Sequence, residues 1–217
     1  MIVDERIAAY IQSLEGDMPE ELRKIEKEAI AEYVPIIKKP TQSLLRFLLH
    51  MKKPLQILEV GTAVGFSSGY MSYYTDDNCH ITTIEKVQQR IDKAKENYKT
   101  IETSRKIQLL EGDATEILHR LAIEKKEYDF IFMDAAKGQY LNFLPDILAM
   151  LKKDGLLVSD NVLQDGDVAE SRYAVIRRNR TIHYRMRDYL YTLTHSEQLE
   201  TIVLPIGDGV AISRKND

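Results

Sequence analysis

Cysteine is scarce in this chain, and long apolar stretches are missing from it. The single cysteine, Cys79, excludes an intrachain disulfide and favours a reducing compartment. No apolar run approaches the roughly 18 residues needed to span a bilayer. The N-terminal segment is charged and amphipathic, unlike a signal peptide. We therefore expect a cytoplasmic protein that does not enter a membrane.

Positive charge is not in excess either. With 30 Lys and Arg against 34 Asp and Glu, the formal net charge is −4, which argues against a globally basic nucleic-acid binder but leaves room for a local basic patch. The five histidines are scattered without the spacing of zinc ligands. Repeats, low-complexity tracts and flexible linkers are also missing, so one domain over residues 1–217 is expected.

Two parts of this domain differ in pattern. Residues 1–52 are predicted to form N-terminal helices, with Leu44, Leu45, Leu48 and Leu49 on one face and with Pro35 and Pro40 as interruptions. Residues 53–217 are predicted to form an α/β core in which strands alternate with helices. The predicted strands are Leu55–Val60, His80–Glu85, Lys106–Leu110, Tyr128–Met133 and Leu156–Ser159, and the helices between them are Gly65–Tyr74, Val87–Lys99, Ala114–Ile123 and Tyr140–Leu151.

Such alternation implies a parallel sheet with helices on both faces. The strand Tyr128–Met133 is apolar enough to lie in the middle of that sheet. The end of the chain differs, because the apolar runs Leu199–Leu204 and Val210–Ser213 are joined by Pro-Ile-Gly-Asp-Gly and predict an antiparallel hairpin.

A glycine-rich turn follows the first predicted strand. Residues 59–67 have the sequence EVGTAVGFS, and the candidate binding residues in it are Glu59, Gly61, Gly65 and Ser67. Such a turn lets the backbone approach a ligand where α/β sheets bind nucleotides, at the carboxyl ends of the strands. Ala63 leaves G-x-x-x-G in place of the dinucleotide fingerprint G-x-G-x-x-G.

Glu85 ends the next predicted strand, twenty residues after Gly65. A carboxylate there could accept hydrogen bonds from both hydroxyls of a ribose. Taken singly, the glycines could form an ordinary tight turn, and Glu85 could be a solvated strand end or a helix N-cap. Their joint order along the predicted elements favours a nucleotide-containing cofactor.

Oxygen-bearing side chains follow the fourth and fifth predicted strands. Asp134 ends one strand, and Asp160 and Asn161 end the other, so the three should meet at one edge of the sheet. Hard oxygen ligands with positions left for water and substrate suit Mg²⁺ or another divalent cation. Lys137 lies close enough to serve the same substrate oxygen, and its ammonium form is disfavoured beside a cation, which suits a general base. Alternatively, Asp134 and Asp160 cap the following helices and Lys137 is a surface lysine.

These motifs resemble those of a known family. The pattern E-x-G-x-x-x-G from Glu59 resembles motif I of S-adenosylmethionine-dependent methyltransferases. D-x-x-K-x-x-Y from Asp134 and the pair Asp160-Asn161 resemble the cation-dependent catechol and caffeoyl-coenzyme A O-methyltransferases. The resemblance covers nearly the whole chain, including LPIGDGVAISR near its end. It implies the class I methyltransferase fold, a Rossmann-like three-layer sandwich with a mostly parallel seven-stranded sheet and an antiparallel C-terminal hairpin.

The resemblance also implies roles for individual residues. S-adenosylmethionine would be the cofactor, and a homodimer would form partly through the N-terminal helices. The metal would be held by Asp134, Asp160 and Asn161, with Lys137 as the base. The cofactor would contact Ile37, Asp134, Gly112, Asp113 and Ala114, with Asp113 near the exocyclic amine of the adenine.

The acceptor is suggested by a basic segment near the predicted site. Two adjacent oxygens are present in catechols and in 5-hydroxyuridine, whose 5-hydroxyl neighbours the 4-carbonyl. Residues 171–187, SRYAVIRRNRTIHYRMR, contain Arg172 and five further arginines, with Tyr173 and Tyr184 among them and no acidic residue. Arginines that grip phosphates and rings that stack on unpaired bases are typical of single-stranded RNA recognition. Alternatively, the segment is a solvated helix whose arginines pair with acidic neighbours or a second subunit.

The run RNRTIHYRMRDYLYTL resembles the bacterial tRNA 5-hydroxyuridine methyltransferases, which make 5-methoxyuridine at the wobble position. This resemblance implies the tRNA anticodon loop as partner, where no duplex needs opening. The RNA-binding residues would be Arg177, Arg178, Arg180 and Arg185. The competing hypotheses are methylation of a small catechol-like phenol and a non-catalytic nucleotide-binding module, although simple binding would not need Asp134, Lys137 and Asp160.

Overall fold

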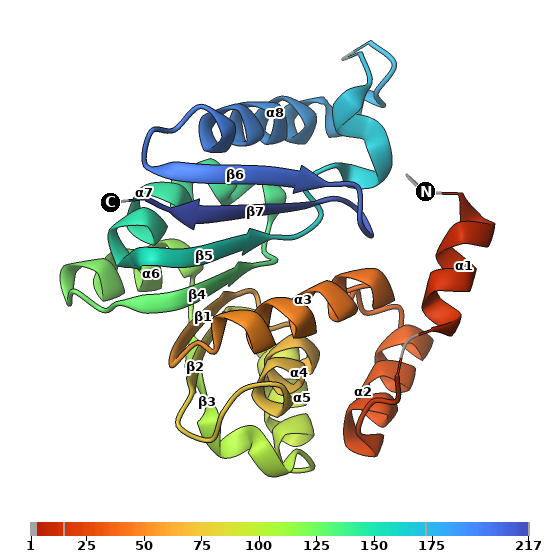
Figure 1. The fold of residues 1–217 in the computed structure, drawn as a ribbon, viewed down its shortest axis with the longest axis vertical. Coiled ribbons are helices and arrows are strands. Elements are labelled where there is room, and N and C mark those ends of the chain that lie inside the picture. The colour runs from red at the N-terminus through yellow and green to blue at the C-terminus, as the bar shows by residue number, and fades with distance from the viewer. Residues whose placement is uncertain (1–3, 15, 172, 217) are drawn as a thin grey trace.

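A seven-stranded sheet forms the middle layer of the protein in the computed structural model, which describes residues 4–14, 16–171 and 173–216 (Figure 1). The strands are β1 (Gln56–Val60), β2 (His80–Glu85), β3 (Ile107–Glu111), β4 (Tyr128–Met133), β5 (Leu151–Ser159), β6 (Leu199–Leu204) and β7 (Val210–Lys215). Their order across the sheet is β3-β2-β1-β4-β5-β7-β6. Strands β1 to β5 are parallel, and β7 runs antiparallel to both β5 and β6. The predicted parallel sheet and C-terminal hairpin are confirmed.

Helices cover both faces of the sheet. The α-helices are α1 (Glu5–Ser13), α2 (Glu20–Ala31), α3 (Lys39–Lys52), α4 (Phe66–Tyr73), α5 (Gln88–Tyr98), α6 (Ala114–Ile123), α7 (Tyr140–Met150) and α8 (Arg180–Thr194). Short 3₁₀ turns are η1 (Glu102–Lys106), η2 (Lys137–Gln139), η3 (Gln164–Ala169) and η4 (Arg177–Asn179). Within the described residues, no helix is long and apolar enough to cross a membrane.

The central strand β4 divides the hydrophobic core into two halves. Its side chains alternate, so Phe130 and Phe132 pack with α2, α3 and α4, whereas Ile131 and Met133 pack with α6, α7 and α8. All four side chains are fully buried. This strand lies between β1 and β5, as its apolar sequence predicts.

Two differences from the sequence-based prediction exceed the shifts of one or two residues at the other element ends. Strand β5 begins at Leu151, because Leu151 pairs with Tyr128 before the register shifts and β5 continues along β4. The polar residues at 152–154 gave no apolar signal for this early start. Pro40 lies in the first turn of α3 and does not interrupt it, since the first turn leaves backbone N–H groups unpaired and tolerates proline.

The turn between β6 and β7 is fastened to the loop that follows β5. Val162 and Leu163 donate backbone hydrogen bonds to the carbonyls of Gly209 and Asp208, at 2.9 and 3.0 Å. Gly209 has a φ of +90°, and a Cβ there would lie 2.3 Å from the Leu163 side chain, so only glycine fits. The hairpin therefore brings Asp208 to the carboxyl edge of the sheet.

Candidate active site

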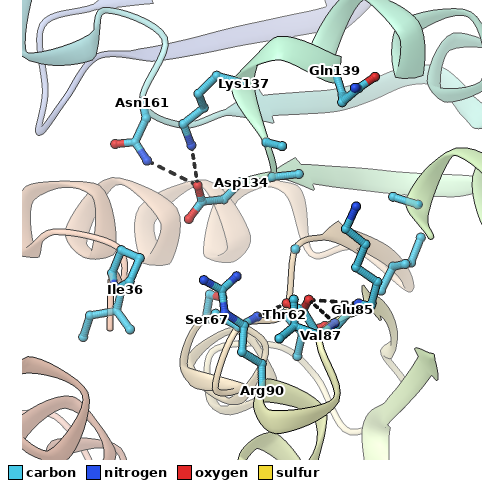
Figure 2. A pocket seen from close by; sticks show the side chains of 18 of the residues that line it. Ile36, Thr62, Ser67, Glu85, Val87, Arg90, Asp134, Lys137, Gln139 and Asn161 are labelled. Atoms are coloured by element: carbon cyan, nitrogen blue, oxygen red, sulfur yellow. Dashed lines mark hydrogen bonds and ion pairs between the residues drawn. The ribbon is translucent and has the colours of Figure 1, made fainter. Parts of the chain in front are cut away.

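A cavity of about 630 Å³ opens at the carboxyl ends of the parallel strands. Figure 2 shows side chains from several of these strand ends facing it. Of the residues expected from the sequence, those lining the cavity are Ile37, Gly61, Ser67, Glu85, Gly112, Asp113, Ala114, Asp134, Lys137 and Asn161. Expected residues outside this lining are Glu59, Gly65, Asp160, Arg177, Arg178, Arg180 and Arg185.

The glycine-rich turn needs both of its glycines. Gly61 has a φ of +106°, and a Cβ there would lie 2.1 Å from the carbonyl oxygen of Asp134. Gly65 has a φ of +80° at the N-cap of α4, and a Cβ there would lie 2.7 Å from the ring of Tyr98. The tight turn and the pocket wall are thus the same feature, so the two interpretations of these glycines are compatible.

Glu59 lies beneath the turn and outside the cavity. It is fully buried, and its carboxylate accepts hydrogen bonds from the hydroxyls of Ser67 and Thr83. Burial raises the pKa of Glu59 to about 7, although these hydrogen bonds oppose the rise. Because the Ser67 hydroxyl donates its hydrogen bond to Glu59, its oxygen is left as an acceptor toward the cavity. Glu59 therefore orients a lining residue.

Glu85 is a buried wall of the cavity and not a solvated strand end. It is 7% exposed, and its carboxylate accepts hydrogen bonds from the backbone N–H groups of Ala63, Lys86 and Val87, at 3.0, 2.9 and 3.0 Å. These bonds tie the glycine-rich turn to the end of β2. Each carboxylate oxygen carries two lone pairs, so Oε1 is filled by Lys86 and Val87, and Oε2 keeps one position for a donor from a ligand.

Asp113 both caps a helix and lines the cavity. Its side chain caps α6 by accepting from the backbone N–H of Thr115 at 2.9 Å, and it also pairs with Lys86 at 3.2 Å. The hydrogen bond from Thr115, assisted by Lys86, lowers the pKa of Asp113. Asp113 nonetheless lines the cavity with its neighbours Gly112 and Ala114.

Asp134, Lys137 and Asn161 meet at one end of the cavity (Figure 2). The Oδ1 atom of Asp134 lies 2.8 Å from Nζ of Lys137 and accepts a hydrogen bond from Nδ2 of Asn161 at 3.2 Å. The Lys137 side chain is 20% exposed, and that of Asp134 is 23% exposed. Neither is an ordinary surface group.

Asp160 stands directly behind this group. It is 2% exposed, and its Oδ1 atom accepts from the backbone N–H of Asn161 at 2.9 Å. Burial, and next the negative charge of Asp134, raises the pKa of Asp160. Neither aspartate caps a helix, because the N-caps of η2, α7 and η3 are Ala136, Gln139 and Leu163. The capping alternative for these aspartates is therefore wrong.

The donor set fits a hard divalent cation. Within the described residues, no three His, Cys, Asp or Glu side chains gather to hold a metal, so an amide oxygen would have to complete the set. Asn161 has a φ of +59°, a left-handed conformation that asparagine tolerates. A half-turn of its amide would present Oδ1 in place of Nδ2. Two neighbouring carboxylates, one of them deeply buried, would be relieved of repulsion by a cation.

Tyr140 was missed as a site residue by the sequence-based argument. It is fully buried, and its hydroxyl lies 3.0 Å from the carbonyl oxygen of Met133 and 3.1 Å from that of Asp160. Nζ of Lys137 lies 3.4 Å from the same hydroxyl. The hydroxyl thus joins the ends of β4 and β5 beside the lysine. The final tyrosine of D-x-x-K-x-x-Y was the signal that could have found it.

Further polar residues line the cavity without having been expected, among them Lys38, Arg90 and Asp208. Lys38, before α3, forms an ion pair with Asp208 of the β6–β7 turn. This pair joins segments 170 residues apart, which no local pattern reveals. The side chain of Arg90 extends from α5 toward the cavity, as Figure 2 shows.

The arginine segment forms η4 and the start of α8. Arg177 and Arg178 are exposed, and within the described residues neither has an acidic partner in an ion pair. Arg180 donates from Nε to the carbonyl of Val175 at 3.2 Å, and Arg185 donates from Nη1 to that of Gly138 at 2.7 Å. From Arg177 onward the segment is helical, as the solvated-helix alternative expected. Arg172 lies outside the described residues.

Two tyrosines near these arginines are also exposed. Tyr173 is 86% exposed and Tyr184 is 60% exposed. Helix α8 packs against η2, the turn that contains Lys137. Tyr184 thus lies on the helix that touches the candidate catalytic turn, and Arg177 and Arg178 lie in η4 directly before that helix.

Known proteins resemble this chain over nearly its full length. A family model described as O-methyltransferase matches residues 10–216. Caffeoyl-CoA O-methyltransferase 5 of Nicotiana tabacum is 28% identical over 178 residues, which cover 79% of this chain and 73% of that protein. Tapetum-specific methyltransferase 1 of Arabidopsis thaliana is 27% identical over 183 residues, which cover 84% of this chain and 77% of that protein.

Solved structures give the same picture. A Staphylococcus aureus protein provisionally described as a caffeoyl-CoA O-methyltransferase is 32% identical, with a TM-score of 0.85 and 98% of each chain covered. An O-methyltransferase from Bacillus cereus, solved in complex with SAH, is 19% identical, with a TM-score of 0.85 and 97% of each chain covered, and it bears on the fold alone.

Proposed function

This chain belongs to the O-methyltransferase family, and from that premise we propose that it methylates 5-hydroxyuridine at the wobble position of tRNA. S-adenosylmethionine would be the methyl donor, with Mg²⁺ or another divalent cation at the acceptor end. The observation that carries the proposal is the pair of exposed arginines in η4, Arg177 and Arg178, directly before α8, the helix that packs against the turn that contains Lys137.

The donor would occupy the part of the cavity formed by the ends of β1, β2 and β3. Glu85 is placed to accept hydrogen bonds from ribose hydroxyls, and Gly112 to Ala114 form the wall beside it. The oxygen of Ser67, oriented by Glu59, can accept from the amino-acid end of the donor. Ile37 is buried beside the same cavity and would pack against the donor.

The acceptor would occupy the end formed by β4 and β5. Asp134, Asp160 and Asn161 would hold the cation there, and its charge would make the reacting hydroxyl of the acceptor more acidic. Lys137 lies within reach of the same oxygen and would take its proton. Tyr140 holds the two strand ends and faces the lysine.

The RNA part of the proposal rests on charge and exposure. Arg177 and Arg178 extend into solvent without acidic partners among the described residues, and would contact phosphates. Tyr173 and Tyr184 are exposed enough to stack on unpaired bases. In a chain with a net charge of −4, this local concentration of arginine is selective.

A small catechol-like phenol is the second candidate acceptor. It is favoured by the names of relatives that are called caffeoyl-CoA O-methyltransferases. The same metal ligands and lysine would serve it, because a vicinal diphenol also presents two adjacent oxygens. The arginines would then have no role in the reaction.

Mass spectrometry separates these two acceptors. We expect the purified protein to add a methyl group to 5-hydroxyuridine in tRNA at physiological salt, and 5-methoxyuridine to disappear from the tRNA of cells that lack it. Methylation of a vicinal diphenol with no activity on tRNA would support the second candidate. No methylation of either acceptor, with Mg²⁺ and donor present, would contradict both.

We also propose that the chain forms a homodimer through its N-terminal helices. Helix α1 lies at the edge of the molecule (Figure 1). Its side chains Ile7, Tyr10 and Ile11, and that of its C-cap Leu14, are at least half exposed, at 53%, 66%, 50% and 67%. Light scattering should give twice the monomer mass, and charged substitutions at Ile7 and Ile11 should give the monomer. A monomer in the wild type would contradict this proposal.

A further inference from the structure

We propose that Arg185 positions the turn that carries Lys137, and that it is not one of the RNA phosphate contacts. The inference rests on the proposed function only for the role of Lys137. Nη1 of Arg185 donates a hydrogen bond of 2.7 Å to the carbonyl oxygen of Gly138, the residue that directly follows Lys137. Arg180, at the start of α8, instead donates a hydrogen bond to the carbonyl of Val175.

Gly138 is adapted to this contact. It does not belong to the glycines with positive φ, so its backbone conformation does not require glycine. A Cβ at this position would lie 3.3 Å from Nη1 of Arg185, which is tighter than most such contacts, and 3.9 Å from Cδ, which is ordinary contact. Even alanine would therefore require the guanidinium to shift slightly, and a larger residue would displace it further. The absence of a side chain at Gly138 leaves the guanidinium its place against the turn.

A second contact joins α8 to the same turn. The ring of Tyr189 meets the ring of Tyr140 edge-on at 5.3 Å, and the Tyr189 hydroxyl lies 2.7 Å from that of Ser159. Tyr140 begins α7 directly after η2, and its hydroxyl faces Lys137. Helix α8 thus contacts this part of the chain at two points, through Arg185 at Gly138 and through Tyr189 at Tyr140. Both points lie within three residues of Lys137.

We expect loss of the contact between Arg185 and Gly138 to lower the rate of catalysis and not the affinity for the acceptor. Lys137 must stay within hydrogen-bonding distance of the reacting oxygen, and small displacements of such a group lower the rate steeply. If Arg185 releases Gly138, the turn gains freedom and Lys137 spends less time in its position. Donor binding involves residues at the other end of the cavity, so it should be preserved.

Arg187 offers a matched control on the same helix. It is exposed, and its Nη1 atom donates to a backbone carbonyl, that of Glu170, at 3.4 Å. That carbonyl belongs to the loop before η4, far along the chain from Lys137. R187A removes the same charge and a similar hydrogen bond without touching the catalytic turn.

The first experiment measures kcat and KM for R185A, R185K and R187A with whichever acceptor the wild type uses. For R185A we expect kcat to fall by about tenfold or more, with KM for donor and acceptor within about twofold of wild type. R185K keeps one donor for Gly138 and should recover part of the loss, and R187A should match wild type. A normal kcat with a raised KM for tRNA in R185A would overturn the inference and make Arg185 a phosphate contact.

The second experiment does not depend on any activity. Hydrogen exchange of the peptide covering residues 136–140 should be faster in R185A than in wild type, and unchanged in R187A. If the wild type methylates neither acceptor, the proposed function fails while this exchange result still decides the role of Arg185. Should R185A not fold, R185K and G138A, which crowds the guanidinium, should both show faster exchange. Unchanged exchange in the folded variants would overturn the inference.

Discussion

The ammonium group of Lys137 lies 2.8 Å from Oδ1 of Asp134. The candidate base and a candidate metal ligand are therefore hydrogen-bonded to each other. The same oxygen accepts from Asn161, so Asp134 is the point on which the acceptor end of the cavity converges. Substitutions there change several contacts at once, whereas Asp160 and Lys137 can be tested more cleanly.

The first prediction concerns the metal. D160A should abolish methyl transfer, because it removes a charged oxygen ligand from a set of only three. EDTA should inactivate the wild type, and Mg²⁺ should restore it. N142A, on an exposed side chain of α7 outside the cavity lining, is the control and should remain active. Full activity of the wild type in EDTA would contradict the metal assignment.

The second prediction concerns Lys137. K137A should lower kcat by about 100-fold or more while leaving the affinity for S-adenosylmethionine within about twofold, because a general base acts in the transition state. Kinetics and calorimetry measure the two quantities separately. A parallel loss of rate and donor affinity would make Lys137 a binding or structural residue.

The third prediction concerns Tyr140. Y140F removes the hydroxyl that joins the carbonyls of Met133 and Asp160, and should cost about 1–2 kcal/mol in the free energy of unfolding. The rate should also fall, since the same hydroxyl faces Lys137. Y191F, on a side chain that is 65% exposed, is the matched control. A Y140F protein with wild-type stability and rate would show that this hydroxyl is dispensable.

Much of this site followed from the sequence because its residues lie at strand ends. Glu85 is the last residue of β2, Asp134 and Asn161 follow β4 and β5, and parallel strands end at one edge of a sheet. The alternation of strands and helices predicted the sheet, and the residues of the C-terminal hairpin predicted its antiparallel end. Both are local sequence patterns, so the sequence alone was sufficient to predict these two features of the fold.

The remaining features depend on contacts between distant segments. The ion pair of Lys38 with Asp208 and the hydrogen bond of Arg185 with Gly138 join elements far apart in the chain, so no spacing reveals them. Glu59 was expected to touch the cofactor because it belongs to the motif. Its position on β1 instead points it beneath the turn, where Ser67 and Thr83 enclose it.

The fourth prediction concerns that buried carboxyl group. Burial raises the pKa of Glu59 to about 7 from an ordinary value of 4.5. Between these two pH values, Glu59 is therefore protonated in the folded protein and ionised in the unfolded chain. Stability from this group is fully present below pH 4.5 and is lost as the pH rises through about 7. The loss is about 3 kcal/mol at most.

E59Q removes this titration. Denaturant unfolding at pH 5 and pH 8 should therefore show the free energy of unfolding of E59Q improving relative to wild type as the pH rises. Using the difference between the two proteins cancels the titration of all other groups. A difference that does not change with pH would mean that Glu59 does not titrate in this interval.

The last prediction concerns the RNA surface, and it separates the two candidate acceptors. Arg177 and Arg178 are exposed, and among the described residues they have no acidic partners, so their charges are available to phosphates. The double variant R177A/R178A should bind tRNA more weakly, and the log–log dependence of affinity on salt should become shallower by roughly 0.7–0.9 for each lost contact. Affinity for S-adenosylmethionine should not change, because neither residue lines the cavity.

R105A/R120A, which removes two arginines near the opposite edge of the sheet, controls for net charge. Thermal unfolding of both variants should match wild type, since the stems of Arg177 and Arg178 are exposed. If the folded R177A/R178A protein binds and methylates tRNA with the wild-type salt dependence, these arginines are not the RNA contacts; if the wild type ignores tRNA altogether, the phenol acceptor is favoured.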